Sequence, residues 1–183
     1  KGIMEFLIPV CKAYGTDMGF RVTELGIQCF GGYGYCNDYP MNQFMRDLKI
    51  ASLYEGTNGI QALDLVGRKL GMQKGAVFMN YLSEMNKTYE TYKNDPRLAD
   101  MAKIVKEYID LLAGMGMYFA SCTKEGKFMI PIANAVPFLH LVGNVSLAWM
   151  HMWMAGIAQS KLEEIYKAKG ISADDKKAIR ELP

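Results

Sequence analysis

The chain has 183 residues, half of which are hydrophobic, and its 21 Lys and Arg and 19 Asp and Glu give a net charge of +2. Such a chain can bury a sizeable core, and its small net charge and high hydrophobicity exclude intrinsic disorder. Neither sign of charge forms a block, so nucleic acid is not expected as a partner. The length allows one large domain or two small ones.

The first predicted element is a helix that begins near Pro9, a residue suited to a first helical turn. Its apolar residues recur at steps of three and four, which places them on one helical stripe. The stripe consists of Leu7, Val10, Tyr14, Met18, Val22 and Leu25. Residues 28–40 follow with three glycines, an Asn-Asp pair and a proline, which predicts a loop.

A second helical pattern runs from about Met41 to Tyr54, and residues 55–58 interrupt it. A third helix then begins with Asn58 or Thr57 as its N-cap. Gln61 lies three residues after Asn58, the spacing of the reciprocal half of a capping box.

Beyond Gly71 the spacing stays helical, with helices predicted at 74–93, 96–122, 130–169 and 172–181. No alternating β-branched pattern is visible, so the predicted fold class is all-α. We expect a first domain at 1–72, a helical bundle, and a second at 73–183, built from helical hairpins. The core of the hairpins is expected around Ile104, Tyr108, Leu111, Leu141, Val145 and Trp149.

Residues 128–160 contain no Lys, Arg, Asp or Glu, a length that could cross a membrane. Asn134, His140, Asn144 and His151 interrupt this run, and polar side chains in lipid are costly. We therefore favour a buried central helix over a membrane span. The two histidines are about three turns apart, and we expect hydrogen-bonded core or interface groups there, not a metal pair.

The four cysteines are Cys11, Cys29, Cys36 and Cys122, and they form no CxxC pair and have no His at metal-ligand spacing. We expect free, buried thiols and no metal site. The N-terminal stretch has no small-residue cleavage pattern of a secretory leader. Without an initiator Met, the chain reads like the middle of a longer polypeptide.

Two local features carry potential chemistry. The glycines of residues 31–34 form a flexible turn after a helix, without the strand-then-helix context of a dinucleotide fingerprint. Glu55 lies just before a helix N-terminus, where the helix dipole favours an ionised, proton-accepting carboxylate. On position alone, Glu55 also fits a solvated acid in a loop.

Three motifs taken together are more specific: QCFGGYGY at 28–35, RDLKI at 46–50 and YEGTNGIQ at 54–61. In this order and spacing they resemble the C-terminal helical domain of the flavin-dependent acyl-CoA dehydrogenases. The resemblance covers about residues 1–70. The remainder, about 75–183, is similar to the extra helical domain of a subgroup that includes the methylthiopropionyl-CoA dehydrogenases.

This resemblance implies α,β-dehydrogenation of an acyl-CoA thioester to 2,3-enoyl-CoA, with hydride transfer to FAD. Glu55 matches the family's base, which removes the α-proton. The backbone N–H of that residue helps to polarise the thioester carbonyl in the family. Gly56 then leaves room for the substrate thioester beside the base.

The resemblance also implies which positions contact FAD. They are Thr57, Asn58 and Gly59 beside the base, and Gln28, Gly31 and Gly32, which in the family reach the cofactor usually from the neighbouring subunit. A homo-oligomer is therefore expected. Arg46 and Asp47 match a family pair, for which we favour a structural role, as a helix-surface ion pair or as a carbonyl clamp that fixes the loop before Glu55.

An electron-transferring flavoprotein is the electron acceptor that the resemblance implies. The expected location is the bacterial cytoplasm, or the mitochondrial matrix in a eukaryote. The family's N-terminal helical domain and middle β domain are absent from these residues, so the chain alone is expected to be inactive. In the family, the acyl pocket is lined mostly by segments outside these residues.

Alternative readings within the fold are an acyl-CoA oxidase or an alkylation-response relative. An alternative of a different class is a non-catalytic helical interaction module or a membrane-associated module. The 14 methionines and the uncharged run after Phe128 favour that class.

Overall fold

The computed structural model describes residues 1–172 and residue 175. All regular secondary structure in this part of the chain is helical, which confirms the all-α prediction. The helix predicted at 172–181 lies almost wholly outside the described residues.

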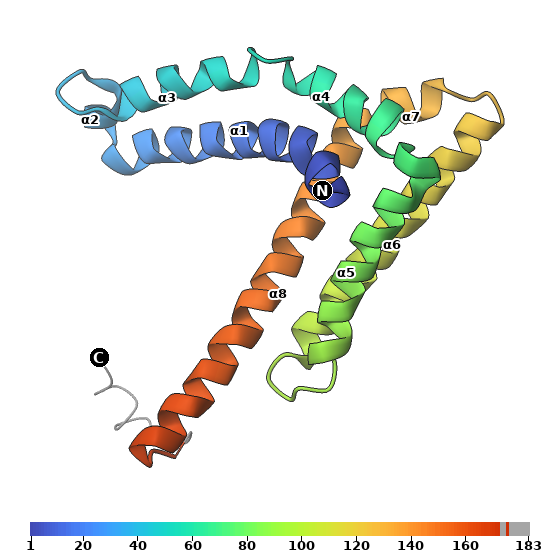
Figure 1. Ribbon diagram of the computed structural model, residues 1–183. Coiled ribbons are helices and arrows are strands. Elements are labelled where there is room, and N and C mark those ends of the chain that lie inside the picture. The colour runs from blue at the N-terminus through green and yellow to red at the C-terminus, as the bar shows by residue number, and fades with distance from the viewer. Residues whose placement is uncertain (173–174, 176–183) are drawn as a thin grey trace.

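The elements follow one another with short connections. The first half contains α1 (Gly2–Phe30), α2 (Gly32–Tyr35), α3 (Met41–Lys49), the 3-10 helix η1 (Ile50–Ser52), α4 (Asn58–Asp64) and the π-helix η2 (Leu65–Lys69). The second half contains the 3-10 segment η3 (Met72–Gly75), α5 (Ala76–Tyr92), α6 (Ala99–Lys124), α7 (Met129–Ala133) and α8 (Ala135–Lys169). Figure 1 shows α1 and α3 side by side as an arm, and α5 and α6 as a second pair.

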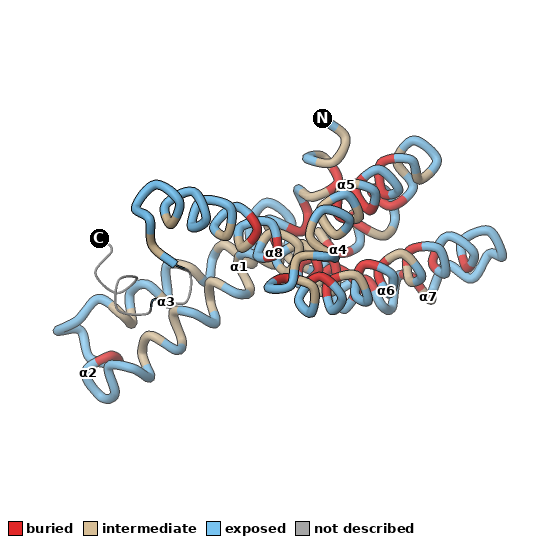
Figure 2. The backbone as a smooth tube through the Cα atoms, turned by 90° about the horizontal axis from the view of Figure 1, so that it is seen from below, coloured by how far each residue is buried: buried red, intermediate tan, exposed pale blue. Residues whose placement is uncertain are grey.

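The core lies where the arm meets the second pair and α8. The Phe6 ring of α1 packs against the rings of Phe78 and Tyr81 on α5, with centroids 5.7 and 5.4 Å apart. Buried residues of η2, α6 and α8 complete the same cluster. Burial is concentrated at this junction, whereas α2 and α3 are mostly exposed (Figure 2). The start of α4 is thus held near the core, and the far end of the arm is open.

The prediction of which α6 residues are buried is wrong by one position along the helix. Three predicted core residues are about half exposed: Ile104, Tyr108 and Leu111. The buried residues are instead their neighbours Val105, Ile109 and Leu112. Apolar side chains occupy two adjacent stripes of this helix, so periodicity alone does not reveal which stripe faces the bundle. On α8, Val145 is buried as predicted, and Leu141 and Trp149 pack against the core cluster.

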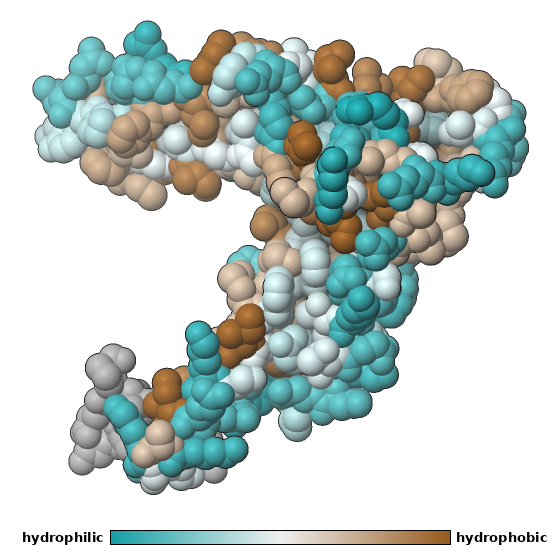
Figure 3. Space-filling model, viewed as in Figure 1, coloured by the Kyte–Doolittle hydropathy of each residue, from teal (hydrophilic) through white to brown (hydrophobic). Residues whose placement is uncertain are grey.

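Helix α1 begins earlier than expected. Pro9 lies in its interior and is buried, so the first-turn prediction is wrong. Only the first half of the predicted apolar stripe packs into the core, because Met18, Val22 and Leu25 remain exposed. Figure 3 shows apolar surface along the arm.

The predicted loop at 28–40 is also partly helical. Gln28 lies in the last turn of α1, and Gly32 begins α2. Glycine allows this compact turn, because a Cβ on Gly34 would lie 2.6 Å from the Ile27 carbonyl oxygen. The chain can therefore fold back directly from α1 to α3.

The cysteines are free, as predicted, but only Cys122 is buried. Cys11, Cys29 and Cys36 are exposed, so the expectation of buried thiols is wrong for three of the four. Cys11 and Cys29 are on α1, and Cys36 directly follows α2.

The uncharged run at 128–160 forms α7 and most of α8. Among the described residues, no helix combines the length and the apolarity that a membrane crossing requires. The first half of α8 is buried against α1, α4 and α6, as expected for a central helix. Farther along the helix, Trp153, Met154 and Ile157 are exposed.

Helix α6 offers a matched test of packing. A Cβ on Gly116 would lie 2.4 Å from the ring of Phe78, which is itself buried, whereas a Cβ on Gly114 would meet nothing within 4 Å. We expect Gly116→Ala to lower the free energy of unfolding by about 1–3 kcal/mol because of overpacking. Gly114→Ala should raise it by up to about 1 kcal/mol through helix propensity. Urea unfolding of both variants checks this, and equal effects would contradict the packing described.

Tyr81 predicts a pH dependence of stability. Burial raises its pKa to about 12, while its hydrogen bond with Ser146 opposes that rise. Between about pH 10 and 12 the unfolded chain loses a proton that the folded chain keeps, so stability falls as pH rises. Over this range the wild type should lose about 2 kcal/mol more than Tyr81→Phe. Denaturant unfolding across the range measures the difference, and parallel pH profiles would refute it.

Candidate functional site

The loop before α4 holds two consecutive residues in left-handed backbone conformation, Glu55 with φ 54° and Gly56 with φ 80°. Such a conformation is strained for a glutamate. Two side chains hold the carbonyls of this turn. Gln61 Nε2 donates to the Glu55 oxygen at 2.8 Å, and Lys12 Nζ donates to the Gly56 oxygen at 2.7 Å. The turn is therefore fixed from α4 on one side and from α1 on the other.

Asn58 ties the first turn of α4 to α1. Its Nδ2 donates to Asp17 Oδ1 at 2.7 Å and to Thr16 Oγ1 at 2.9 Å. Its Oδ1 accepts from Lys12 Nζ at 2.9 Å. The side-chain amide is thus engaged within the chain, and the position of α4 relative to α1 depends on it.

The N-cap of α4 is Thr57, one of the two residues predicted. Its hydroxyl oxygen accepts from the Ile60 amide at 3.4 Å. The predicted capping box is wrong, because the Gln61 side chain binds the Glu55 carbonyl instead of a backbone amide at the cap. The left-handed turn brings that carbonyl within reach of Gln61.

The Glu55 side chain is exposed at the surface of this loop. Gly56 has little room for a side chain on its inner side, since a Cβ would lie 3.2 Å from Gln61 Nε2. Both its φ angle and this approach favour glycine. The loop therefore presents a carboxylate and, next to it, a backbone without a side chain.

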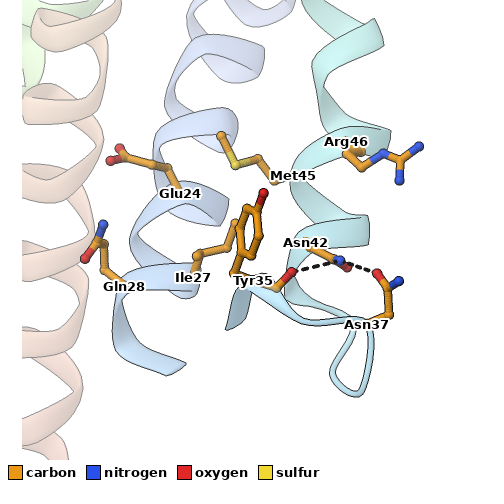
Figure 4. A pocket seen from close by; sticks show the side chains of 8 residues that line it. All are labelled: Glu24, Ile27, Gln28, Tyr35, Asn37, Asn42, Met45 and Arg46. Carbon is orange, nitrogen blue, oxygen red and sulfur yellow. Dashed lines mark hydrogen bonds between the residues drawn. The ribbon is translucent and has the colours of Figure 1, made fainter. Parts of the chain in front are cut away.

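A second group of predicted residues lies at the far end of the arm. Gln28 lines a pocket of about 580 Å³ between α1 and α3 (Figure 4). The pocket is lined by Glu24, Ile27, Gln28, Tyr35, Asn37, Asn42, Met45 and Arg46. Asn42 Nδ2 braces its rim by donating to Asn37 Oδ1 at 2.6 Å. A Cβ on Gly31 or Gly32 would meet nothing within 4 Å, so the backbone there is open to a large neighbour.

The structure does not bring the two groups together within one chain. Gln28 lies eleven residues after Asp17 on α1, which corresponds to about 16 Å along the helix axis. Figure 1 shows α2 at one end of the arm and α4 at the other. Each group would thus meet a different part of a ligand, or a different ligand.

The favoured structural role for Arg46 and Asp47 is wrong. No ion pair joins them, and the Asp47 carboxylate instead accepts a hydrogen bond from Gln43 on its own helix. No carbonyl clamp from Arg46 is present among the described residues either. Its guanidinium is directed away from Gln28 and Glu24 at the edge of the pocket (Figure 4). Their spacing on α3 separates the two side chains on the helix surface.

His140 lies at the interface between α1 and α8. Its Nε2 lies 3.4 Å from Asp17 Oδ2, and its ring packs on Tyr14 with centroids 5.6 Å apart. His151 is exposed on the same helix. Within residues 1–172 and 175, no group of three or more His, Cys, Asp or Glu is placed to bind a metal ion.

Sequence reasoning missed Lys12, which contacts both the turn and Asn58. A signal was present, because Lys12, Thr16 and Asp17 are polar and close in helical spacing within an otherwise apolar segment. The residues that line the pocket beside Gln28 were missed as well. Their proximity depends on the angle between α1 and α3, which no local pattern encodes.

Two family models match the chain. Residues 2–71 match the acyl-CoA dehydrogenase, C-terminal domain, and residues 81–174 match the acetyl-CoA dehydrogenase C-terminal like family. The chain belongs to the acyl-CoA dehydrogenase family.

Relatives with longer chains agree with this assignment. The chain is 46% identical over 93 residues to a butyryl-CoA dehydrogenase of Syntrophomonas wolfei, covering 51% of this chain and 15% of that protein. It is 30% identical over 181 residues to 3-methylmercaptopropionyl-CoA dehydrogenase of Ruegeria pomeroyi, covering 95% of this chain and 30% of that protein. The latter match confirms the resemblance to the subgroup with an additional helical region. The chain thus spans less than a third of either relative.

A solved structure shares the fold. The crystal structure of Caenorhabditis elegans ACDH-11 in complex with C11-CoA matches with a TM-score of 0.64 and 20% identity. The match covers 82% of this chain and 26% of ACDH-11. The arrangement of helices described above is therefore that of an acyl-CoA dehydrogenase C-terminal region.

The strained turn makes a testable prediction about stability. Glycine adopts a left-handed conformation without the cost of about 1–2 kcal/mol that other residues meet. We expect Glu55→Gly to keep or raise the free energy of unfolding, by up to about 1 kcal/mol. Glu107→Gly, at an exposed position within α6, should lower it by about 1 kcal/mol. Urea unfolding compares the two, and a similar loss in both would show that the turn is unstrained.

Proposed function

We propose that the chain is the C-terminal part of an FAD-dependent enzyme that oxidises acyl-CoA thioesters to 2,3-enoyl-CoA, with Glu55 as the base. The observation that supports this most strongly is the turn at Glu55 and Gly56, which presents an exposed carboxylate on a backbone held from two helices. A base must keep its position while a proton moves, and such bracing serves that need. Membership in the acyl-CoA dehydrogenase family supports the same reaction.

In this proposal the Glu55 carboxylate removes the α-proton of the thioester. The backbone N–H of Glu55 donates to the thioester carbonyl oxygen and stabilises the negative charge that develops there. Gly56 has no side chain that would take up space beside the base. FAD, when bound, supplies the acceptor for the β-hydride.

The residues predicted to contact FAD have donors that fit it. Thr57, Asn58 and Gly59 are at the start of α4, where backbone amides lack partners within the helix. Because the Asn58 side chain is engaged with α1, we assign its backbone to the cofactor. The open backbone at Gly31 and Gly32 fits a large planar or phosphate-bearing group.

The separation of the two groups along α1 supports a homo-oligomer. One subunit would contribute the loop at 55–59, and its partner would contribute Gln28, Gly31 and Gly32 to the same FAD. The pocket beside Gln28 has amide and phenol groups that suit a nucleotide. We further propose an electron-transferring flavoprotein as acceptor, and a location in the bacterial cytoplasm or the mitochondrial matrix.

The test is Glu55→Gln in the full-length polypeptide that carries this chain. We expect flavin absorbance and protein stability to be retained. Reduction of the flavin by a panel of acyl-CoAs should be slowed by about 10²–10⁴-fold, because the amide accepts no proton. Stopped-flow absorbance measures this rate.

The matched control is Glu107→Gln, which changes an exposed glutamate on α6 and should leave the rate unchanged. Flavin reduction by Glu55→Gln at the wild-type rate would exclude Glu55 as the base. Absence of flavin from the wild-type protein would exclude the proposal as a whole.

A further inference from the structure

Lys12 lies where a single side chain can control the turn at Glu55 and Gly56. Its Nζ donates to the Gly56 carbonyl oxygen at 2.7 Å and to Asn58 Oδ1 at 2.9 Å. Among the described residues, no carboxylate lies within ion-pair distance of this ammonium group. Its charge is therefore directed at two neutral oxygens, one in the turn and one at the start of α4, and holds them at a fixed separation.

The same contacts extend to α8. Asn58 donates to Asp17 Oδ1, and the other Asp17 oxygen lies 3.4 Å from His140 Nε2 on α8. One turn farther along α8, Asn144 Oδ1 accepts from the Tyr14 hydroxyl at 2.7 Å. Tyr14 lies two residues after Lys12 on α1, so α8 fixes the segment of α1 that carries the ammonium group.

The close approach of α1 and α8 at this level is built into the sequence. A Cβ on Gly143 would lie 2.3 Å from the Tyr14 ring, so glycine is needed there for the two helices to meet. The residues of α8 involved lie within 81–174, the region matched by the second family model. That region therefore reaches the turn by a continuous set of polar contacts.

We propose that Lys12 is a positioning residue for proton abstraction by Glu55, and that α8 supports it through His140 and Asp17. The inference rests on the proposed function of Glu55. It adds a role for the second helical region, residues 81–174. Without the Lys12 donor, the peptide between Gly56 and Thr57 loses the partner that fixes its orientation. Glu55 then loses its alignment with the substrate, and small misplacements of a reacting group are costly to the rate.

The test compares Lys12→Met with Lys87→Met in the full-length holoenzyme. Methionine keeps the length and apolar stem of lysine but has no donor. Lys87 is an exposed lysine on α5 whose ammonium group pairs with Glu84 on its own helix. We expect Lys12→Met to lower kcat by about 10- to 100-fold, with KM changed far less and FAD content unchanged. Lys87→Met should match the wild type.

Two further variants separate positioning from folding. Lys12→Arg keeps a charged donor, so it should retain more of kcat than Lys12→Met. His140→Phe keeps a ring against Tyr14 but removes the contact with Asp17, and it should lower kcat in the same direction by a smaller factor. Its control is His151→Phe, which changes an exposed histidine on the same helix.

The outcomes are distinguishable. An unchanged kcat in Lys12→Met would overturn the positioning role, while an inactive Glu55→Gln would still support the proposed function. Full activity in Glu55→Gln would instead remove the proposed function and this inference with it. If Lys12→Met does not fold, the kcat values of Lys12→Arg and His140→Phe, compared with that of the wild type, test the positioning role. Unchanged kcat in His140→Phe would then overturn the inference, and a lowered kcat with unchanged FAD content would support it.

Discussion

The attachment of the first turn of α4 to α1 is the interaction on which the site depends. Asn58 donates to Asp17 and Thr16 and accepts from Lys12, so both ends of its amide bind the same helix. This attachment fixes where the helix begins, and therefore where the preceding turn must lie. A strained turn persists only when its surroundings hold it, and here the side chains of Lys12 and Gln61 hold its two carbonyls.

The proposed chemistry follows from that geometry. An exposed acid on a flexible loop would sample many positions, whereas Glu55 extends from a backbone fixed on both sides. Buried residues of α1, α5, α6 and α8 form one core with α4. The helices that follow α4 in the sequence therefore also support its position. This gives the second helical region a physical connection to the turn, through His140 and Asp17. The far end of the arm, with Gln28 and its pocket, is suited to a separate contact.

The sequence predicted the helical class, most helix positions and two candidates for the α4 cap, one of which is Thr57, because these depend on local spacing and capping chemistry. It did not predict which apolar stripe of α6 is buried, since two adjacent stripes are equally apolar and only tertiary packing selects one. The motifs identified the turn at Glu55 through the resemblance that they carry. The role of Lys12 depends on a contact between residues 44 positions apart, which no local pattern contains.

The most direct test is a structure of the full-length polypeptide with an acyl-CoA thioester analogue bound. The account predicts a Glu55 carboxylate oxygen within about 3–3.5 Å of the substrate α-carbon, in line for proton removal. It also predicts that Lys12 Nζ still contacts the Gly56 carbonyl in that complex. A different acid at the α-carbon, with Glu55 turned to solvent, would contradict the account.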